Sequence, residues 1–487
     1  MPKSNPLFTN KRPRIRIGFR FLQFIHVEGA SGILLLFATA IAMILANSSW
    51  REIYFSFFET RIVVGIPELF VIDKNLTQWI NDGLMTVFFF LVGLELKREF
   101  LVGELSSIQK AILPALAAVG GMAVPVLIFW GFNRHDPMAL EGWAIPMATD
   151  IAFAIGVLTL IGRRAPLSLM VSLTALAVVD DLGAVIVIAL FYTQQLHIAA
   201  LGVGLAILAL TFLYGYMGGR NLLVFVGLGV LVWLAFLFSG VHATIAGVLL
   251  ALTIPVRTRI DAFKFIERIQ HLVHAFREDH TQSGAVAIIP SPEQRALLSE
   301  MKRLIDLADS PLRKLELIIH PWSAYVIMPL FALANAGVTI DANLVSGFTS
   351  PLALGIMLGL FLGKPIGIFT FTWLAVKLGL GALPRGIRWQ HVLGAGFLGG
   401  IGFTMAIFIT TLAFGAAEGH AQIMGFRLAA PAAWAAMSAS EMQQVAKMAI
   451  FTASALAGLT GFILLRIMPI STDSDVIIEL DQLANGS

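Results

Sequence analysis

The sequence predicts an all-α polytopic membrane protein with about twelve transmembrane helices. Of its 487 residues, 57% are hydrophobic and only 13% are charged, which is about half the charged fraction of a typical soluble protein. Stretches of about 20 residues without charge recur along the chain, and each is long enough to cross the hydrocarbon core of a bilayer. Because backbone groups must be satisfied within each span, we expect these stretches to be helical.

The expected spans follow one another at short intervals. They cover 29–48, 77–94, 112–133, 142–162, 167–192, 198–217, 221–236, 240–255, 315–337, 352–375, 390–415 and 446–468. Between the first two spans, "RIVVGIPELFVI" (61–72) alternates around a glycine and a proline, which indicates a small β-hairpin.

We expect one membrane domain with an insertion. Its parts are a basic tail 1–26, spans one to eight in 27–255, an inserted loop 256–310, spans nine to twelve in 311–470, and a tail 471–487. Within the insertion, "IDAFKFIERIQHLVHAF" predicts an amphipathic helix, "REDHTQSGAVAIIPSPEQ" a flexible loop, and Ser291-Pro292 the start of a second helix. Residues 416–445 are expected to form an alanine-rich outer loop.

The distribution of charge predicts on which side of the membrane the two termini lie. The first 20 residues contain six basic residues and no acid: Lys3, Lys11, Arg12, Arg14, Arg16 and Arg20. No apolar core of a cleaved signal is present there. The positive-inside rule therefore predicts that both termini, the insertion and the basic loops are cytoplasmic. These loops account for the net charge of +3, so no nucleic-acid partner is expected. The lack of cysteine excludes disulfides and thiolate metal sites.

Four charged residues interrupt apolar spans: Asp150, Asp180, Asp181 and Lys364. Each costs about 2.5–3.5 kcal/mol at mid-membrane, so a function is expected. One purely structural Asp–Lys pair would explain only two of the four. Carboxylates suit hard cations or protons, and adjacent aspartates can titrate as a coupled pair. Since they lie about 100° apart on a helix, one can face Lys364 while the other faces a cation path.

Two spans are predicted to be broken. "GWAIPMATDIAFAIG" in span four contains Pro146, and "GAGFLGGIGFTMAIF" in span eleven contains five glycines. Matching interruptions in two halves are typical of inverted-repeat secondary transporters with a midplane site. Asp150 is placed to compensate half-helix N-termini and Lys364 to compensate C-termini. The alternative is that these glycines only permit close helix packing.

Several long motifs resemble the NhaA-type sodium/proton antiporters. They are "WINDGLMTVFFFLVGLELKREF", "ATDIAFAIGVL", "ALAVVDDLGAVIVIALFYT", "SGVHATIAGV", "LELIIHPW", "FALANAGV", "GKPIGI" and "GGIGFTMAIFI". The resemblance runs from about 27 to 415 outside the insertion and is much weaker afterwards. This family is itself an example of the inverted-repeat architecture, so the two arguments are not independent.

The resemblance implies a transporter rather than an enzyme, without a cofactor. It implies electrogenic export of Na⁺ and Li⁺ for sodium and pH homeostasis, driven by two inward H⁺ per cation and activated at alkaline pH. It also implies a homodimer, joined at the 61–72 hairpin, in the bacterial cytoplasmic (inner) membrane.

The family's site residues carry over by motif. Asp181 is the expected cation ligand, Asp180 the partner of Lys364, and Thr149 and Asp150 lie where the broken helices cross. The residues linked to the pH response are Glu95, Glu99, Glu316, His242 and Asp82, with Lys97 and Arg98 beside them. A solvated helix end would equally explain the Glu95–Glu99 pair, and a packing role would explain His242.

Two other functions compete with antiport. A sodium-coupled solute symporter or channel would also place carboxylates in the membrane, although no pocket for an organic substrate is evident. An intramembrane enzyme would need acids on separate spans, but the sequence lacks the glycine-flanked second aspartate of the aspartyl proteases and a second Asp-rich motif for magnesium. The histidines 271, 274 and 280 of the insertion are interpreted as surface residues rather than metal ligands.

Overall fold

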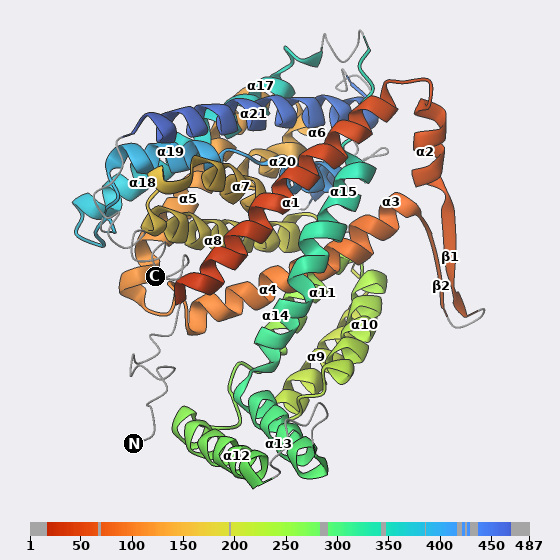
Figure 1. Ribbon diagram of the computed structural model, residues 1–487. Coiled ribbons are helices and arrows are strands. Elements are labelled where there is room, and N and C mark those ends of the chain that lie inside the picture. Colours follow the sequence, from red (N-terminus) through yellow and green to blue (C-terminus); the bar gives the residue numbers. More distant parts are fainter. Residues whose placement is uncertain are drawn as a thin grey trace.

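The computed structural model is a bundle of long helices with a two-stranded hairpin at one end and a helical pair at the other (Figure 1). The structure describes residues 17–66, 70–193, 196–282, 291–341, 347–384, 386–415, 421–423, 426–428 and 437–468. The expected tails therefore lie largely outside the described residues, as does much of the expected outer loop 416–445. The domain limits stay predictions.

The first half of the chain forms most of the bundle and the hairpin. Its elements are α1 (Ile17–Ala46), α2 (Arg51–Glu59), β1 (Arg61–Ile66), β2 (Phe70–Asn75), α3 (Leu76–Trp79), the π-turn η1 (Ile80–Leu84), α4 (Met85–Leu101), α5 (Ile108–Asn133), α6 (Pro137–Leu140), the 3₁₀ segment η2 (Glu141–Met147), α7 (Ile151–Ile161), η3 (Gly162–Arg164), α8 (Leu167–Phe191), α9 (Ile198–Tyr216), α10 (Leu222–Ser239) and α11 (Ala243–Thr253).

The second half contributes the insertion and the remaining helices. Its elements are α12 (Ala262–Gln282), α13 (Pro292–Ala308), α14 (Pro311–Trp322), the π-turn η4 (Ser323–Ile327), α15 (Met328–Asn335), α17 (Pro351–Leu358), the π-turn η5 (Gly359–Gly363), α18 (Lys364–Lys377), α19 (Trp389–Gly399), α20 (Phe403–Gly415), β3 (Ala421–Ile423), β4 (Phe426–Leu428) and α21 (Ala439–Ile467).

The spans are confirmed as helices, but their number is not confirmed as twelve. Within the described residues, eight unbroken helices are long and apolar enough to cross a membrane, or eleven spans if each bent pair counts as one. The eighth expected span, 240–255, is helical only over the eleven residues of α11. The last span begins at Ala439 rather than at 446 because Ser438 caps its first turn. The count of twelve stays a prediction.

The predicted hairpin is confirmed. Strands β1 and β2 pair antiparallel, with Arg61 opposite Asn75 and Ile66 opposite Phe70. Asn75 then caps α3, where its side chain accepts a hydrogen bond from the backbone N–H of Gln78. The hairpin therefore leads directly into the helical run α3–η1–α4, and this end of the bundle is called the hairpin end below.

Both predicted helix breaks are confirmed. The first half-helix pair, Pro137–Met147 and Ile151–Ile161, bends by 42°, and the second, Trp389–Gly399 and Phe403–Gly415, bends by 44°. In the first pair, Pro146 lies in a 3₁₀ segment that ends just before the break. In the second, Gly400 follows α19 and Gly402 precedes α20. Exposed backbone at two such breaks needs partners from the rest of the bundle.

The insertion forms a helical hairpin at the end of the bundle opposite β1 and β2. Both expected helices are present, and Ser291 caps α13 with Pro292 at its first position, as predicted. The expected loop from 277 is wrong in its first part, because α12 continues to Gln282. Residues 283–290 lie outside the described residues. This region is called the insertion end below.

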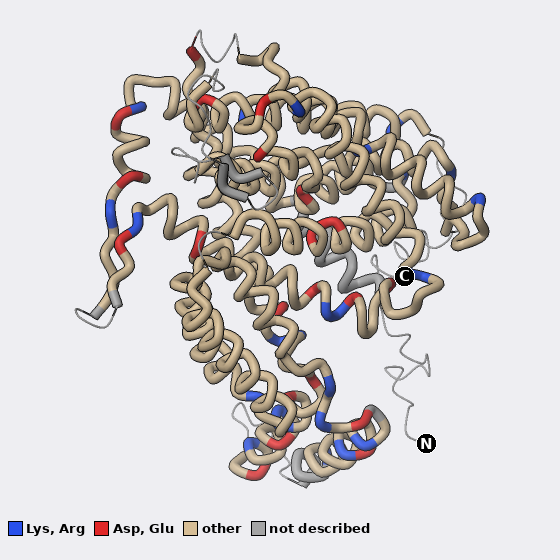
Figure 2. The backbone as a smooth tube through the Cα atoms, turned by 180° about the vertical axis from the view of Figure 1, so that it is seen from behind, with Lys and Arg blue, Asp and Glu red and all other residues tan. Residues whose placement is uncertain are grey.

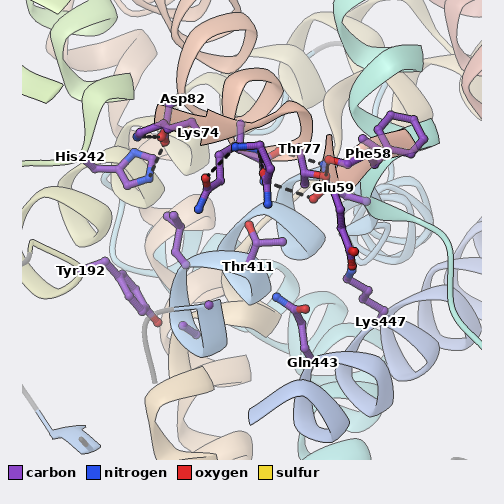
Figure 3. A pocket seen from close by; sticks show the side chains of 18 of the residues that line it. Phe58, Glu59, Lys74, Thr77, Asp82, Tyr192, His242, Thr411, Gln443 and Lys447 are labelled. Atoms are coloured by element: carbon purple, nitrogen blue, oxygen red, sulfur yellow. Dashed lines mark hydrogen bonds and ion pairs between the residues drawn. The ribbon is translucent and has the colours of Figure 1, made fainter. Parts of the chain in front are cut away.

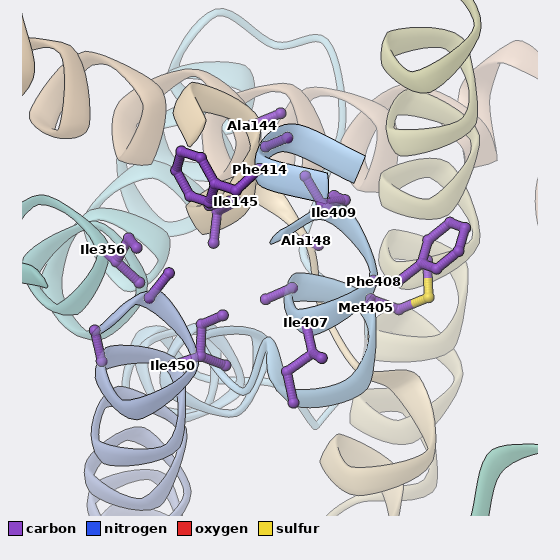
Figure 4. Packing of buried hydrophobic residues seen from close by; sticks show 14 of the residues in the cluster. Ala144, Ile145, Ala148, Ile356, Met405, Ile407, Phe408, Ile409, Phe414 and Ile450 are labelled. Carbon is purple, nitrogen blue, oxygen red and sulfur yellow. The ribbon is translucent and has the colours of Figure 1, made fainter. Parts of the chain in front are cut away.

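The largest apolar cluster joins the two halves of the chain. Figure 4 shows Ile145 and Ala148 of the first broken pair facing Ile407 and Phe414 of the second, with Ile450 of α21 alongside. By contrast, lysines, arginines and acids gather on the hairpin, on α12 and α13, and on the connecting loops (Figure 2). Helices with few exposed charges and a shared apolar core are typical of one membrane domain.

Candidate functional site

The two broken helices cross with their backbones in direct contact. The N–H of Asp150 donates to the carbonyl of Ile401 at 2.7 Å, and the hydroxyl of Thr149 donates to the carbonyl of Gly399 at 2.8 Å. Thr149 and Asp150 are fully buried, at 0% and 1% exposed. Each break thus satisfies backbone groups that the other break exposes.

Asp150 serves as a cap for half-helices of both pairs. Its carboxylate accepts hydrogen bonds from the N–H of Phe153 at 3.2 Å and from the N–H of Thr404 at 3.1 Å. The hydroxyl of Thr404 also donates to it. Phe153 lies in the first turn of α7 and Thr404 in the first turn of α20, so one negative charge faces two positive helix ends. The predicted position of Asp150 at the half-helix N-termini is confirmed.

Lys364 is fully buried and pairs with Asp180. Its Nζ lies 2.7 Å from Asp180 Oδ2 and 2.6 Å from the hydroxyl oxygen of Thr149. The ammonium therefore reaches the C-terminal end of α19 only indirectly, because Thr149 bonds Gly399, the last residue of that helix. The predicted Asp180–Lys364 pair is confirmed. Asp180 Oδ1 is buried and finds no hydrogen-bond partner among the described residues.

Asp181 lines a cavity that Asp180 does not line. This cavity has a volume of about 70 Å³ and is also lined by Thr149 and Asp150. Toward the insertion end its lining includes Glu95 and Arg98 of α4. The adjacent aspartates therefore have different surroundings, as the helical geometry predicts: Asp180 contacts Lys364, and Asp181 lines a cavity.

The α4 residues linked to the pH response form a cluster at the insertion end. Arg98 lies 3.0 Å from Glu99 and also pairs with Glu316 of α14. Lys97 donates to the carbonyls of Leu252 and Ile254 at 2.6 and 2.5 Å. A solvated helix end would not connect three helices in this way, so the cluster joins α4, α11 and α14.

Asp82 and His242 do not belong to that cluster. They line a cavity of about 640 Å³ at the hairpin end (Figure 3). Asp82 pairs with Lys74, and its Oδ1 lies 3.8 Å from His242 Nε2. Thr411 and Lys447 lie on other parts of the same cavity wall. The sequence analysis assigned Asp82 and His242 to one group with the residues of α4, whereas the structure places the two sets at opposite ends of the bundle.

Sequence reasoning missed three features of the site. Lys74 carried no expected role, although it lies in strand β2 of the hairpin that leads to Asp82. Thr404 lies within a family motif, and its bond to Asp150 was not foreseen. The π-turns were also missed: η1 contains Asp82, and η5 ends directly before Lys364. Single π-turns inside helices often mark functional sites, but no simple sequence pattern announces them.

A buried carboxylate site at the crossing of two broken helices is typical of a secondary transporter. The sequence comparisons agree with this class. A family model described as Na⁺/H⁺ antiporter 1 matches residues 22–465. The match extends beyond residue 415, where the resemblance is expected to weaken, and includes most of α21. The chain belongs to the Na⁺/H⁺ antiporter 1 family, and it is a multi-pass membrane sodium/proton antiporter rather than an enzyme.

Similar proteins cover nearly the same length. The Na(+)/H(+) antiporter NhaA of Oleidesulfovibrio alaskensis is 44% identical over 448 residues, or 92% of this chain and 94% of the relative. That of Wolinella succinogenes is 46% identical over 448 residues, or 92% of each chain. That of Aeromonas hydrophila is 48% identical over 393 residues, or 80% of this chain and 87% of the relative.

Proposed function

We propose that this antiporter exports Na⁺, and also Li⁺, in exchange for two inward H⁺ at the site of Asp180 and Asp181. The exchange is electrogenic because the charges moved do not balance. The protein acts in the bacterial cytoplasmic membrane with both termini in the cytoplasm, and it needs no cofactor. The different surroundings of the two aspartates support this proposal, because Asp180 pairs with Lys364 whereas Asp181 lines a cavity.

Competition for the carboxylates is the proposed mechanism. Asp181 binds the cation, together with the hydroxyl of Thr149 and the nearby Asp150, all of which line the same cavity. Oxygen ligands of this kind suit a hard cation. Asp180 has its Oδ2 bound to Lys364, while its Oδ1 is available for a proton. Cation binding thus displaces protons, and protonation releases the cation.

The two cavities support alternating access. The Asp181 cavity approaches the site from the insertion end, and the larger cavity approaches from the hairpin end. The positive-inside rule assigns the insertion end to the cytoplasm. Sodium therefore enters past Glu95 and leaves toward Asp82, and the crossing helices change which cavity reaches the site.

Alkaline activation is assigned to the cluster at the insertion end. Arg98 of α4 pairs with Glu316 of α14, so a change in the protonation of Glu316 alters the contact between the two helices. Asp82 and His242 are proposed to form a second pH-responsive group, in the cavity at the hairpin end. A homodimer is proposed at the β1–β2 hairpin, where Val63 is 62% exposed, and crosslinking of Val63→Cys in membranes tests it.

Proton movement in everted membrane vesicles tests the exchange. The membrane is energised, a pH-sensitive dye reports acidification, and NaCl, LiCl or KCl is added at several pH values. We expect dequenching by Na⁺ and Li⁺ that rises at alkaline pH and is lost in Asp181→Asn. A mutant that keeps full exchange at wild-type abundance would contradict the site.

Two further measurements separate the competing functions. If NaCl causes no proton movement at any pH, uptake of ²²Na with and without organic solutes tests a symporter. If exchange occurs, its dependence on membrane potential in proteoliposomes tests the stoichiometry, because a one-for-one exchange is insensitive to potential. An unchanged pH profile in Lys364→Ala would remove Lys364 from the proton path.

A further inference from the structure

One charged side chain within a span has no place in the proposed exchange. Helix α21 begins at Ala439 rather than at 446, so Lys447 lies in the third turn of a span instead of at its edge. The residue is only 9% exposed. Ionisable residues within spans are costly, and they typically pair with one another or mark an ion pathway. Lys447 therefore needs either a partner or a function.

No described residue pairs with Lys447. Lys364 donates to Asp180 at 2.7 Å, whereas no hydrogen bond or ion pair joins Lys447 to any residue that the structure describes. Its side chain lines the cavity of about 640 Å³ at the hairpin end, called the hairpin-end cavity below. Figure 3 shows Lys447 on a different part of the cavity wall from Asp82 and His242. Because a lysine can pack its apolar stem while its ammonium reaches polar space, the charge of Lys447 acts on the cavity rather than on one protein partner.

The hairpin-end cavity has more acids than lysines on its wall. Its described lining contains three acids and two lysines: Glu59, Asp82, Glu141, Lys74 and Lys447. Lys74 pairs with Asp82, and the Nε2 of His242 lies 3.8 Å from the same carboxylate. With neutral His242, three acids against two lysines give this lining a formal charge of −1, and it would be −2 without Lys447. Lys447 therefore halves the formal excess of negative charge.

A fixed positive charge in a cavity changes the affinity of that cavity for cations. Like charges repel more strongly where protein walls lower the effective dielectric constant, and a cleft focuses the field of the charges that line it. A transported ion must leave its last site as readily as it enters the first. An acidic exit without Lys447 would retain Na⁺, whereas an unpaired ammonium on the same wall opposes its retention.

From these observations, we propose that Lys447 lowers the affinity of the hairpin-end cavity for Na⁺ and thereby promotes release of the cation on that side. Lys447 is not a ligand of the transported ion, and it acts through its charge alone. The inference rests on the proposed function, in which Na⁺ leaves toward Asp82. The alternative is a structural role, in which the ammonium only offsets the C-terminal end of α20, whose last turn from Thr411 lines the same cavity.

Variants of the full chain in membrane vesicles of both orientations test this proposal. Lys447→Met and Lys447→Gln remove the charge, whereas Lys447→Arg keeps it. Lys377→Met is the matched control, because Lys377 lies 4.7 Å from the ring centre of Trp373 and does not line the hairpin-end cavity. Right-side-out vesicles present the hairpin end to added Na⁺, and everted vesicles present the insertion end. A pH-sensitive dye trapped in the lumen reports the protons that leave as Na⁺ enters, with the membrane potential clamped near neutral pH.

We expect both charge-removing variants to lower the KM for Na⁺ in right-side-out vesicles by about two- to fivefold, with the KM in everted vesicles unchanged. The shift should shrink in concentrated choline chloride, because salt screens the charge. Lys447→Arg and Lys377→Met should keep the wild-type KM on both sides.

Three outcomes would overturn the proposal. An equal change of KM in both orientations would show that Lys447 acts on the ion site itself, and a change in everted vesicles alone would place it at entry instead of release. A lower unfolding temperature with both KM values unchanged would favour the structural role. If the wild type shows no Na⁺-driven proton movement in either orientation, the proposed exchange is itself contradicted, and this inference with it.

Discussion

The crossing of the broken helices and the α12–α13 insertion treat charge in opposite ways. At the crossing, Lys364 and Asp180 are buried and bonded to defined atoms. In the insertion, Arg303 and Glu300 pair at 3.5 Å with side chains that are 72% and 47% exposed. Burying a charge makes its partner obligatory, whereas water can replace a partner at the surface. Substitutions of charged residues should therefore be severe at the crossing and mild in the insertion.

The largest effect on stability is expected for Lys364→Ala. Removing the ammonium leaves the Asp180 carboxylate buried without its partner, which costs about 3–5 kcal/mol. The thermal unfolding of purified protein in detergent measures this loss. The matched control is Lys364→Ala combined with Asp180→Asn, which should recover part of the stability because no buried charge remains. If Lys364→Ala alone is as stable as the wild type, the expected difference between the crossing and the insertion is contradicted.

Asp150→Ala should follow, because it removes three hydrogen bonds to one buried carboxylate. Hydrogen bonds to charged groups contribute about 1.5–3 kcal/mol each, and the removed charge offsets part of that sum, so we expect a loss of about 2–4 kcal/mol. Asp136→Ala is the control, since Asp136 caps only the short helix α6 through the N–H groups of Met138 and Ala139. Equal shifts in the unfolding temperature of the two variants would contradict the double-cap interpretation.

Gly367→Ala tests packing next to the site. A Cβ at Gly367 would lie 2.0 Å from the carbonyl oxygen of Gly120, so α5 and α18 would have to separate. Overpacking of this kind costs about 1–3 kcal/mol, and we expect a lower unfolding temperature. Gly227→Ala on α10 is the control, because a Cβ added at Gly227 would meet nothing within 4 Å. If the unfolding temperature changes more in Gly227→Ala than in Gly367→Ala, helix propensity and not the contact with Gly120 governs both variants.

The smallest effect is expected for Asp306→Asn in the insertion. A hydrogen bond from Lys314 lowers the pKa of the Asp306 carboxyl below its ordinary value. Because the pKa is lower in the folded state, the carboxylate contributes stability above its unfolded pKa, and this contribution is lost as the pH falls through the folded pKa. Water screens the pair, so unfolding at pH 7 should be unchanged within error. A marked loss at pH 7 that vanishes in acid would show that the pair matters more than its exposure indicates.

The same contrast explains how far the sequence alone could predict the molecule. Asp150, Asp180, Asp181 and Lys364 were identifiable because charge is rare in apolar spans, and the adjacent aspartates had to diverge on a helix. The helix breaks were also visible, since Pro146 and the glycines of span eleven disfavour unbroken helices. These features depend on local chemistry, which the order of residues records directly.

Other features depend on contacts between distant segments and were not predictable in this way. The relay from Lys364 through Thr149 to Gly399 requires the two breaks to cross. The pairing of Asp82 with Lys74 and His242 requires the hairpin and α11 to converge. The π-turns before Lys364 and around Asp82 arise where packing shifts a helix register, which hydrophobic periodicity does not reveal.

The backbone bond between Asp150 and Ile401 has a mechanical consequence. Together with the bonds from Thr149 to Gly399 and from Thr404 to Asp150, it fastens the two bent helix pairs at their midpoints. The two helix pairs therefore cannot bend independently unless several buried hydrogen bonds break. A change of access at the ion site is therefore expected to rotate both bent helix pairs together as one rigid body. Sliding is expected only where this body contacts the surrounding helices.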